Sequence, residues 1–180
     1  MNDSQQQLSF QTRFLHWVVA FGMIVLVGVG WYMSEAKDRS LYGVHKSVGM
    51  LLLVFIVWRL VWRLRNGMPQ PVSQQSAALN TLAHAVHWVL LIATVAFPLS
   101  GMVMSAMSGN GLSFFGLEIL ANNPDLANPG RNLPLNRELA GMARNTHGVL
   151  LWITASALVL HVVGALKHHI IDKDGTLKRM

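Results

Sequence analysis

Four long apolar stretches alternate with more polar segments along the 180-residue chain. The stretches cover residues 14–33, 41–62, 79–104 and 146–166. Each approaches or exceeds the ~20 residues that a helix needs to cross the hydrocarbon core of a membrane. Because lipid satisfies no backbone hydrogen bond, such stretches form helices and not open strands. The pattern predicts an all-α fold, an integral membrane four-helix transmembrane bundle, with residues 1–180 in a single domain.

The remaining segments add local detail. Pro98 predicts a kink in the third stretch, and Gly101 would ease the bend. The longest connection, residues 108–144, is rich in Gly, Asn and Pro, and we expect a short interfacial helix over residues 112–121. Residues 1–12 are mostly polar without a basic cluster, so we expect the first stretch to be retained as a helix and not cleaved as a signal peptide.

Composition supports a membrane protein and narrows its chemistry. The chain is 52% hydrophobic and only 12% charged, whereas soluble domains average about 25% charged residues. The net charge of +6 is not gathered into a basic stripe, which argues against nucleic-acid binding. The absence of cysteine excludes disulfides, Cys-ligated iron–sulfur clusters and covalently attached c-type haem. A haem, if bound, is therefore held non-covalently.

The basic residues predict the orientation of the bundle. One side carries eight Lys/Arg: Arg13, Arg59, Arg63, Arg65, Lys167, Lys173, Lys178 and Arg179. The other side carries six, several of them far from a span in the long connection: Lys37, Arg39, Lys46, Arg131, Arg137 and Arg144. By the positive-inside rule we place both termini in the cytoplasm, with Trp31 and Trp62 at opposite membrane interfaces.

Four histidines inside or at the ends of these stretches indicate a functional site, because an ionisable side chain in a bilayer is costly. His147 and His161 lie fourteen residues apart on one predicted helix. That spacing is about 21 Å along the axis and leaves both side chains on nearly the same face. In the predicted topology His45 shares the outer level with His147, and His16 shares the inner level with His161.

Two histidine pairs on different helices match two bis-histidine haem b groups stacked across the membrane, since facing helices of a bundle build such sites. The predicted iron ligands are therefore His16 with His161 and His45 with His147. For any one of them the alternative is an interfacial hydrogen-bonding role. Glycines at positions 43, 49, 148 and 164 would make room for a macrocycle. Basic side chains near the interfaces would pair with haem propionates; these are Arg59, Lys46 and Arg144.

The other four histidines each have two alternative roles. His84 and His87 lie three residues apart on the inner part of the third stretch. They could replace His16 or His161 as ligands, but hydrogen bonding to a propionate or a quinone is the favoured role. His168 and His169 lie at the inner water boundary. They are either a solvated tail or a quinone contact that exchanges protons.

Several motifs resemble the bacterial cytochrome b561 family of small four-helix di-haem membrane proteins. They span almost the whole chain: Arg13-Phe14-Leu15-His16-Trp17, Gly43-Val44-His45-Lys46-Ser47-Val48-Gly49, Leu82-Ala83-His84-Ala85-Val86-His87, Thr146-His147-Gly148, Leu160-His161, Lys167-His168-His169 and the tail from Lys173 to Met180. The resemblance implies two haem b groups on the same histidine pairs, and electron exchange with ubiquinone in the bacterial inner membrane.

The resemblance also implies an activity, because a similar protein of that family oxidises superoxide and passes the electrons to quinone. We therefore expect a superoxide–ubiquinone oxidoreductase, with Lys46 and Arg144 steering the superoxide anion. A second hypothesis is a cytochrome b subunit that passes electrons between quinone and a periplasmic partner protein docked on residues 108–144. A third is a non-haem protein that uses its histidines for metal transport or proton relay.

Overall fold

The computed structural model describes residues 7–69, 72 and 75–179. The first six residues of the polar N-terminal segment, four positions of the connection after the second span and Met180 lie outside the described residues. The elements in chain order are α1 (Phe10–Ala36), α2 (Tyr42–Asn66), α3 (Ala77–Met107), β1 (Leu112–Phe114), β2 (Leu117–Leu120), α4 (Arg137–Ile170) and the short 3₁₀ helix η1 (Leu177–Arg179).

Polar side chains define where three of the helices begin. Ser9 accepts a hydrogen bond from the Thr12 amide at 3.3 Å at the start of α1, and Ser76 caps α3 in the same way. Asn136 Oδ1 accepts from the Leu139 amide at 2.9 Å. Each cap satisfies a backbone donor that the first helical turn leaves free. Because of the Asn136 cap, α4 begins at Arg137 rather than at residue 146, where its apolar stretch begins.

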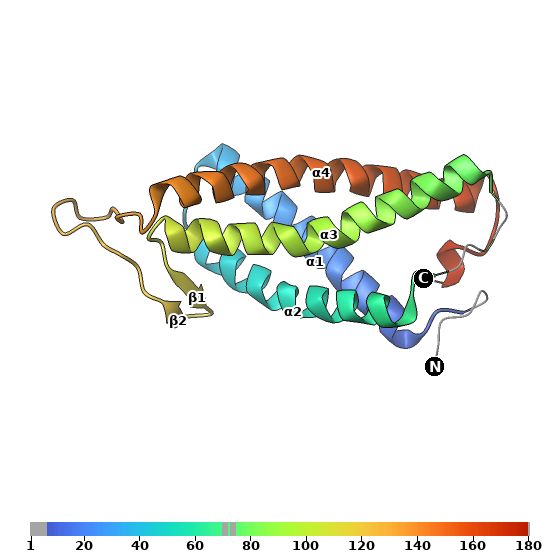
Figure 1. The fold of residues 1–180 in the computed structure, drawn as a ribbon, viewed down its shortest axis with the longest axis horizontal. Coiled ribbons are helices and arrows are strands. Elements are labelled where there is room, and N and C mark those ends of the chain that lie inside the picture. The colour runs from blue at the N-terminus through green and yellow to red at the C-terminus, as the bar shows by residue number, and fades with distance from the viewer. Residues whose placement is uncertain (1–6, 70–71, 73–74, 180) are drawn as a thin grey trace.

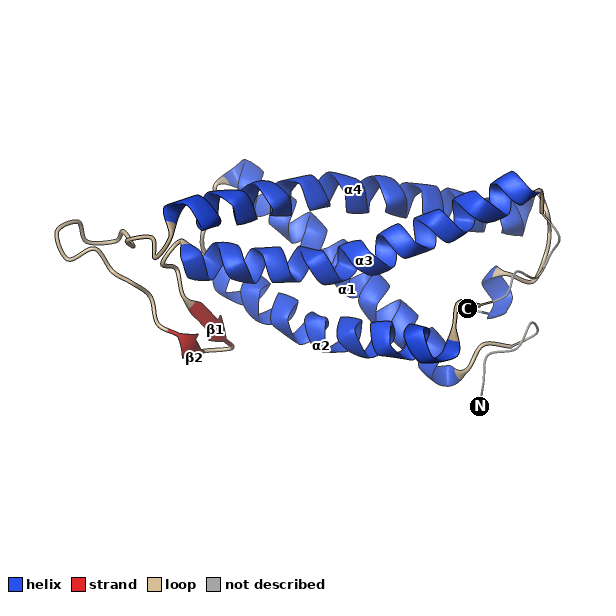
Figure 2. Ribbon diagram, viewed as in Figure 1, coloured by secondary structure: helices blue, strands red, loops and turns tan. Residues whose placement is uncertain are grey.

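The four helices form one bundle in which neighbours along the chain run in opposite directions (Figure 1). α1 packs on α2, and α3 packs on both α2 and α4. α3 contains Pro98 and changes direction along its length (Figure 1). The start of α1 and the end of α4 lie at the same end of the bundle (Figure 2).

The core is small and the outer surface is apolar, as expected in lipid. Buried side chains of α1, α2 and α3 form the core cluster: Val19, Met23, Leu26, Leu52, Ile56 and Phe97. Large apolar side chains also cover the outside, including Val54 at 63% exposure and Trp152 at 74%. Within the described residues four helices are long and apolar enough to cross a membrane. The predicted helical membrane bundle and its four spans are thereby confirmed.

Residues 112–120 form a β-hairpin, and the interfacial helix predicted over residues 112–121 is wrong. β1 pairs antiparallel with β2, with Phe114 opposite Leu117. The two residues between them, Phe115 and Gly116, have positive φ angles of 48° and 91°. Positive φ at both central residues is the geometry of a type I′ turn, whose twist suits a two-residue hairpin. The Phe115-Gly116 pair is the turn signal in the sequence, but it lies inside an otherwise apolar segment.

Candidate functional site

The histidines gather at the two ends of the bundle. We call the end where α1 begins and α4 ends the inner end, and the opposite one the outer end, following the side assignment made from the charges. His16 of α1, His87 of α3 and His161 of α4 come together at the inner end. His45 near the start of α2 and His147 in the first part of α4 lie at the outer end.

At the outer end, His147 is held by groups from α3. Its Nδ1 lies 3.1 Å from the Phe97 carbonyl oxygen and 2.9 Å from Ser100 Oγ. The ring also stacks on Phe97, with centroids 4.2 Å apart. Because a carbonyl oxygen only accepts, Nδ1 carries the proton and donates it to Phe97. The lone pair of Nε2 is then free to bind a metal ion.

His45 is the less satisfied of the two outer histidines. Its Nδ1 is buried and has no hydrogen-bond partner among the described residues. A buried polar atom without a partner costs free energy, so such an atom indicates a site for a further group.

Two glycines keep space open beside these rings. A Cβ on Gly30 of α1 would lie 3.3 Å from His45 Cε1, and a Cβ on Gly101 of α3 would lie 3.1 Å from His147 Cε1. All four helices therefore contribute to the outer cluster. A Cβ on any of the glycines predicted for this role would meet nothing within 4 Å. That role therefore stays a prediction for Gly43, Gly49, Gly148 and Gly164.

The inner cluster holds three imidazoles. The ring centroids of His16 and His161 are 6.1 Å apart, and those of His87 and His161 are 5.1 Å apart at an interplanar angle of 67°. Arg59 Nη2 lies 3.5 Å from His16 Nδ1, at the limit of hydrogen-bond distance. A guanidinium only donates, so Arg59 here faces the lone pair of that nitrogen.

Three other predicted contacts have different surroundings. His84 lies outside the cluster, with Nδ1 3.0 Å from the Asn80 carbonyl oxygen. Lys46 Nζ donates to the carbonyl oxygens of Asn110 at 3.1 Å and Gly111 at 3.4 Å, so it ties α2 to the outer connection. Arg144 is exposed.

Arg144 lines a hollow of about 470 Å³ at the outer end. Arg137 and the residues Asn110 and Asn132 also line it. The hollow therefore carries two cationic side chains.

The segment after α4 folds back on the inner end. His168 Nδ1 lies 2.7 Å from Asp174 Oδ2, and Lys167 Nζ lies 2.7 Å from Asp172 Oδ2. The Lys167 ammonium, followed by the Gln75 amide, lowers the pKa of the Asp172 carboxyl. His169 is exposed on the last turn of α4.

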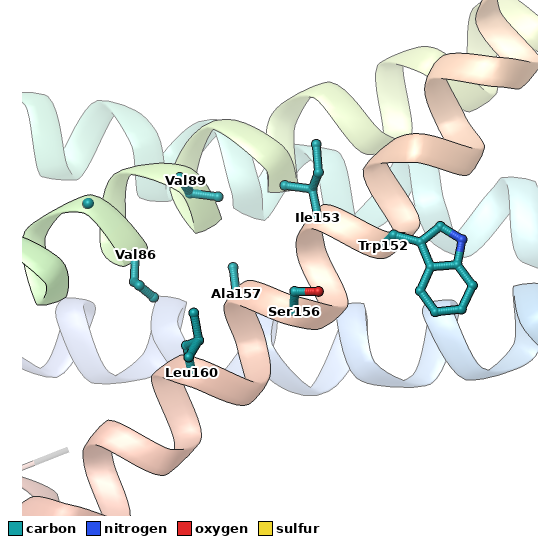
Figure 3. A pocket seen from close by; sticks show the side chains of 8 residues that line it. Val86, Val89, Trp152, Ile153, Ser156, Ala157 and Leu160 are labelled. Atoms are coloured by element: carbon teal, nitrogen blue, oxygen red, sulfur yellow. The ribbon is translucent and has the colours of Figure 1, made fainter.

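A second hollow, of about 420 Å³, lies between α3 and α4 and is almost entirely apolar (Figure 3). Val86 and Val89 come from α3, and Ile153, Ala157 and Leu160 come from α4. This apolar lining suits a hydrocarbon chain.

Comparison with known proteins decides the family. The family model described as prokaryotic cytochrome b561 matches residues 7–180. The chain belongs to the prokaryotic cytochrome b561 family. It is therefore a transmembrane b-type haem electron-transfer protein, a multi-pass protein of the bacterial inner membrane.

Individual relatives of the cytochrome b561 family align over nearly the whole chain. "Cytochrome b561 homolog 2" of Escherichia coli (strain K12) is 33% identical, with 92% of this chain and 86% of that protein covered. "Probable superoxide oxidase CybB" of Yersinia pestis is 30% identical, with coverage of 92% and 90%. "Cytochrome b561 homolog 1" of Escherichia coli (strain K12) is 27% identical, with coverage of 93% and 92%.

The histidine clusters fit the b-type haem of a cytochrome b561. The outer cluster has a free Nε2 on His147, the orphaned Nδ1 on His45 and two glycines that leave space beside the rings. In the inner cluster, a centroid separation of 6.1 Å between His16 and His161 leaves room for one metal ion, since metal–imidazole bonds are about 2.0 Å long.

Four residues around these clusters were not predicted as site residues from the sequence. Gly30, Gly101 and Ser100 border the outer histidines, and Asp174 pairs with His168. The signal for the first three was a small residue in an apolar helix at the depth of a histidine on another helix. That signal can be used only once the rotation of each helix is known.

Proposed function

We propose that this cytochrome b561 is a di-haem b superoxide–ubiquinone oxidoreductase. It oxidises superoxide at the outer side, passes electrons across the membrane and reduces ubiquinone at the inner side. The observation that carries the proposal is the pair of histidine clusters at opposite ends of one membrane-spanning bundle. The name of the Yersinia pestis relative, "Probable superoxide oxidase CybB", supports superoxide as the electron donor.

We assign the ligands by cluster. His45 and His147 would hold the outer haem, and His16 and His161 the inner one. Two metal–imidazole bonds of about 2.0 Å fit the 6.1 Å centroid separation of His16 and His161 better than the 5.1 Å separation of His87 and His161. We therefore give His87 a hydrogen bond to a propionate or to quinone. Arg59 would turn its guanidinium from His16 to a propionate carboxylate, which it binds as a charge-assisted pair.

The proposed reaction transfers two electrons. Haem b, when bound, would supply a one-electron iron couple, and a site that holds it with two imidazoles would suit electron transfer. Two superoxide anions lose one electron each to give two O₂. One ubiquinone takes those two electrons and two protons to give ubiquinol.

The chain's own residues guide the anion and the protons. Arg137 and Arg144 line the outer hollow and form no ion pair within the described part of the chain, so they attract the superoxide anion. At the inner end, Nδ1–H of His168 donates to Asp174. Nε2 of His168 is then the atom that exchanges a proton with quinone.

The alternative is a cytochrome b subunit without a small-molecule donor of its own. A partner protein would dock on the outer connection between α3 and α4. Leu126 in that connection is 93% exposed. In that case the haems would take electrons from the partner and not from superoxide.

A pyridine haemochrome assay and a redox difference spectrum of detergent-purified protein test the haem content. We expect two haem b per chain with low-spin bis-histidine spectra. Pulse-generated superoxide then tests the donor: haem reduction with ubiquinol formation supports the oxidoreductase, and no response favours the cytochrome b subunit. A folded preparation without haem contradicts both.

A further inference from the structure

The β1–β2 hairpin at the outer end exposes a continuous set of apolar side chains. Phe115 is 61% exposed, Leu117 is 68% exposed and Ile119 is 59% exposed. Glu118 is the one charged residue between Leu112 and Leu120. Soluble surfaces rarely carry so concentrated an apolar patch, and where they do it marks an interaction site.

Hydrogen bonds fix this hairpin beside α2. The Phe115 amide donates to Ser47 Oγ at 3.0 Å, and Ser47 Oγ lies 3.2 Å from the Ser113 carbonyl oxygen. Ser47 is itself buried, at 2% exposure. The neighbouring Lys46 bonds the two residues before β1, so both ends of β1 are attached to the helix that carries His45.

The attachment sets the depth of the hairpin. Ser47 lies five residues inside the start of α2 at Tyr42, which is about 7.5 Å along the helix axis. The hairpin therefore lies alongside the outer end of α2 and not beyond it, whereas the loop after β2 extends away from the helices (Figure 1).

Exposed aromatic residues mark the same end as a membrane interface. Trp31 and Tyr32 near the end of α1 are 63% and 54% exposed, and Tyr42 at the start of α2 is 44% exposed. Tryptophan and tyrosine gather at the level of the lipid headgroups, where one side of the ring is apolar and the other wet.

We propose that the β1–β2 hairpin inserts Phe115, Leu117 and Ile119 into the interfacial layer of the surrounding bilayer. Lipid fits this surface better than a protein partner does, because the hairpin lies at the depth of the helix ends and offers one charge for a complementary partner. The two strands pair with each other, which limits the backbone groups left without a partner at that depth.

The experiment uses single cysteines, which report one site each because the natural chain has none. Spin labels are placed at Phe115→Cys and, as a second position, Leu117→Cys, in haem-loaded protein in phosphatidylglycerol–phosphatidylethanolamine nanodiscs with one chain each. Leu126→Cys is the water control, since Leu126 is 93% exposed in the outer connection. Val54→Cys, 63% exposed midway along α2, is the lipid control.

Collisions with oxygen and with a water-soluble nickel chelate measure the depth of each label. We expect labels at 115 and 117 to be shielded from nickel severalfold relative to 126, and less deeply than at 54. Nickel access at 115 and 117 equal to that at 126 would overturn the proposal. So would shielding found only in nanodiscs with two chains, because a second copy would then cover the hairpin.

Discussion

His147 illustrates how single residues prepare a metal ligand. The Phe97 carbonyl oxygen and Ser100 Oγ hold Nδ1, and the Phe97 ring holds the imidazole plane. In the proposed assignment Nε2 would therefore be the coordinating atom, and His147 and His161 on one helix would serve different haems. His147→Ala should lose the outer haem and keep the inner one, and His161→Ala should do the reverse.

Pyridine haemochrome quantification checks this pairing. The expected result is that each variant has half the haem content of the unchanged protein. His169→Ala is the control, since His169 is exposed on the same helix and both haems should remain. His87→Ala should also keep both if His16 is the inner ligand. Loss of both haems, or of neither, in folded His147→Ala or His161→Ala contradicts the pairing.

Gly30 and Gly28 on α1 form a matched pair. A Cβ at Gly30 would lie 3.3 Å from His45 Cε1, whereas a Cβ at Gly28 would meet nothing within 4 Å. Gly30→Val should displace the imidazole and weaken outer haem binding by about 10- to 100-fold, the usual effect of disturbing the support of a metal ligand. Gly28→Val should bind haem normally. Equal haem retention by both variants would show that Gly30 gives the ring no needed space.

Arg137 and Arg144 act through their charge. Replacing both with alanine should slow the reaction with superoxide about tenfold at low ionic strength, because a charged opening raises association rates. Added salt should remove the difference, since screening shortens the reach of surface charges. Stopped-flow haem reduction measures both rates. A salt-independent defect would instead indicate damage to the outer cluster.

At the scale of elements, apolar length predicts the part of a helix that lies in lipid but not its ends. α4 begins at Arg137 because Asn136 caps it, and the nine polar or mixed residues that follow carry no membrane signal. The hairpin was missed for a related reason. The segment from Leu112 to Leu120 is apolar enough to suggest an interfacial helix. The positive φ angles of Phe115 and Gly116 instead reverse the chain direction and form the hairpin.

The segment after α4 should respond to acid. Lys167 and Gln75 lower the pKa of the Asp172 carboxyl in the folded protein. A lowered pKa adds stability above the carboxyl's unfolded pKa of about 3.9. That stability is lost as the pH falls through the folded value. The segment should therefore detach from α4 below about pH 4.

A spin label at Leu177→Cys reports this detachment as a gain in mobility. The double variant Leu177→Cys/Asp172→Asn has no carboxyl at position 172 to titrate. Its label should therefore be mobile already at neutral pH, and its mobility should change less on acidification. An unchanged acid transition in that double variant would assign it to another group, such as Asp174.

At the scale of the whole molecule, the histidine clusters depend on contacts between helices, which the hydrophobic periodicity of the sequence does not predict. The sequence analysis paired the histidines by counting spans, and the structure brings the same four to the two ends of the bundle. It could not predict that His87 joins the inner cluster while His84 turns to the Asn80 carbonyl. The two histidines have different surroundings because they lie at different angles around the axis of α3. The packing of α3 against α2 and α4 sets the rotation of that helix.

The direction of electron flow depends on which end faces the cytoplasm. The alternating helices place the start of α1 and the end of α4 together, and the charge bias predicts that this end lies inside the cell. A membrane-impermeant maleimide should label Leu126→Cys in intact cells and Ile171→Cys only after permeabilisation; both side chains are exposed, at 93% and 71%. The reverse pattern would place the His45–His147 cluster on the cytoplasmic side. Superoxide formed outside the cytoplasm could then not be its donor, because the anion would first have to cross the hydrocarbon core.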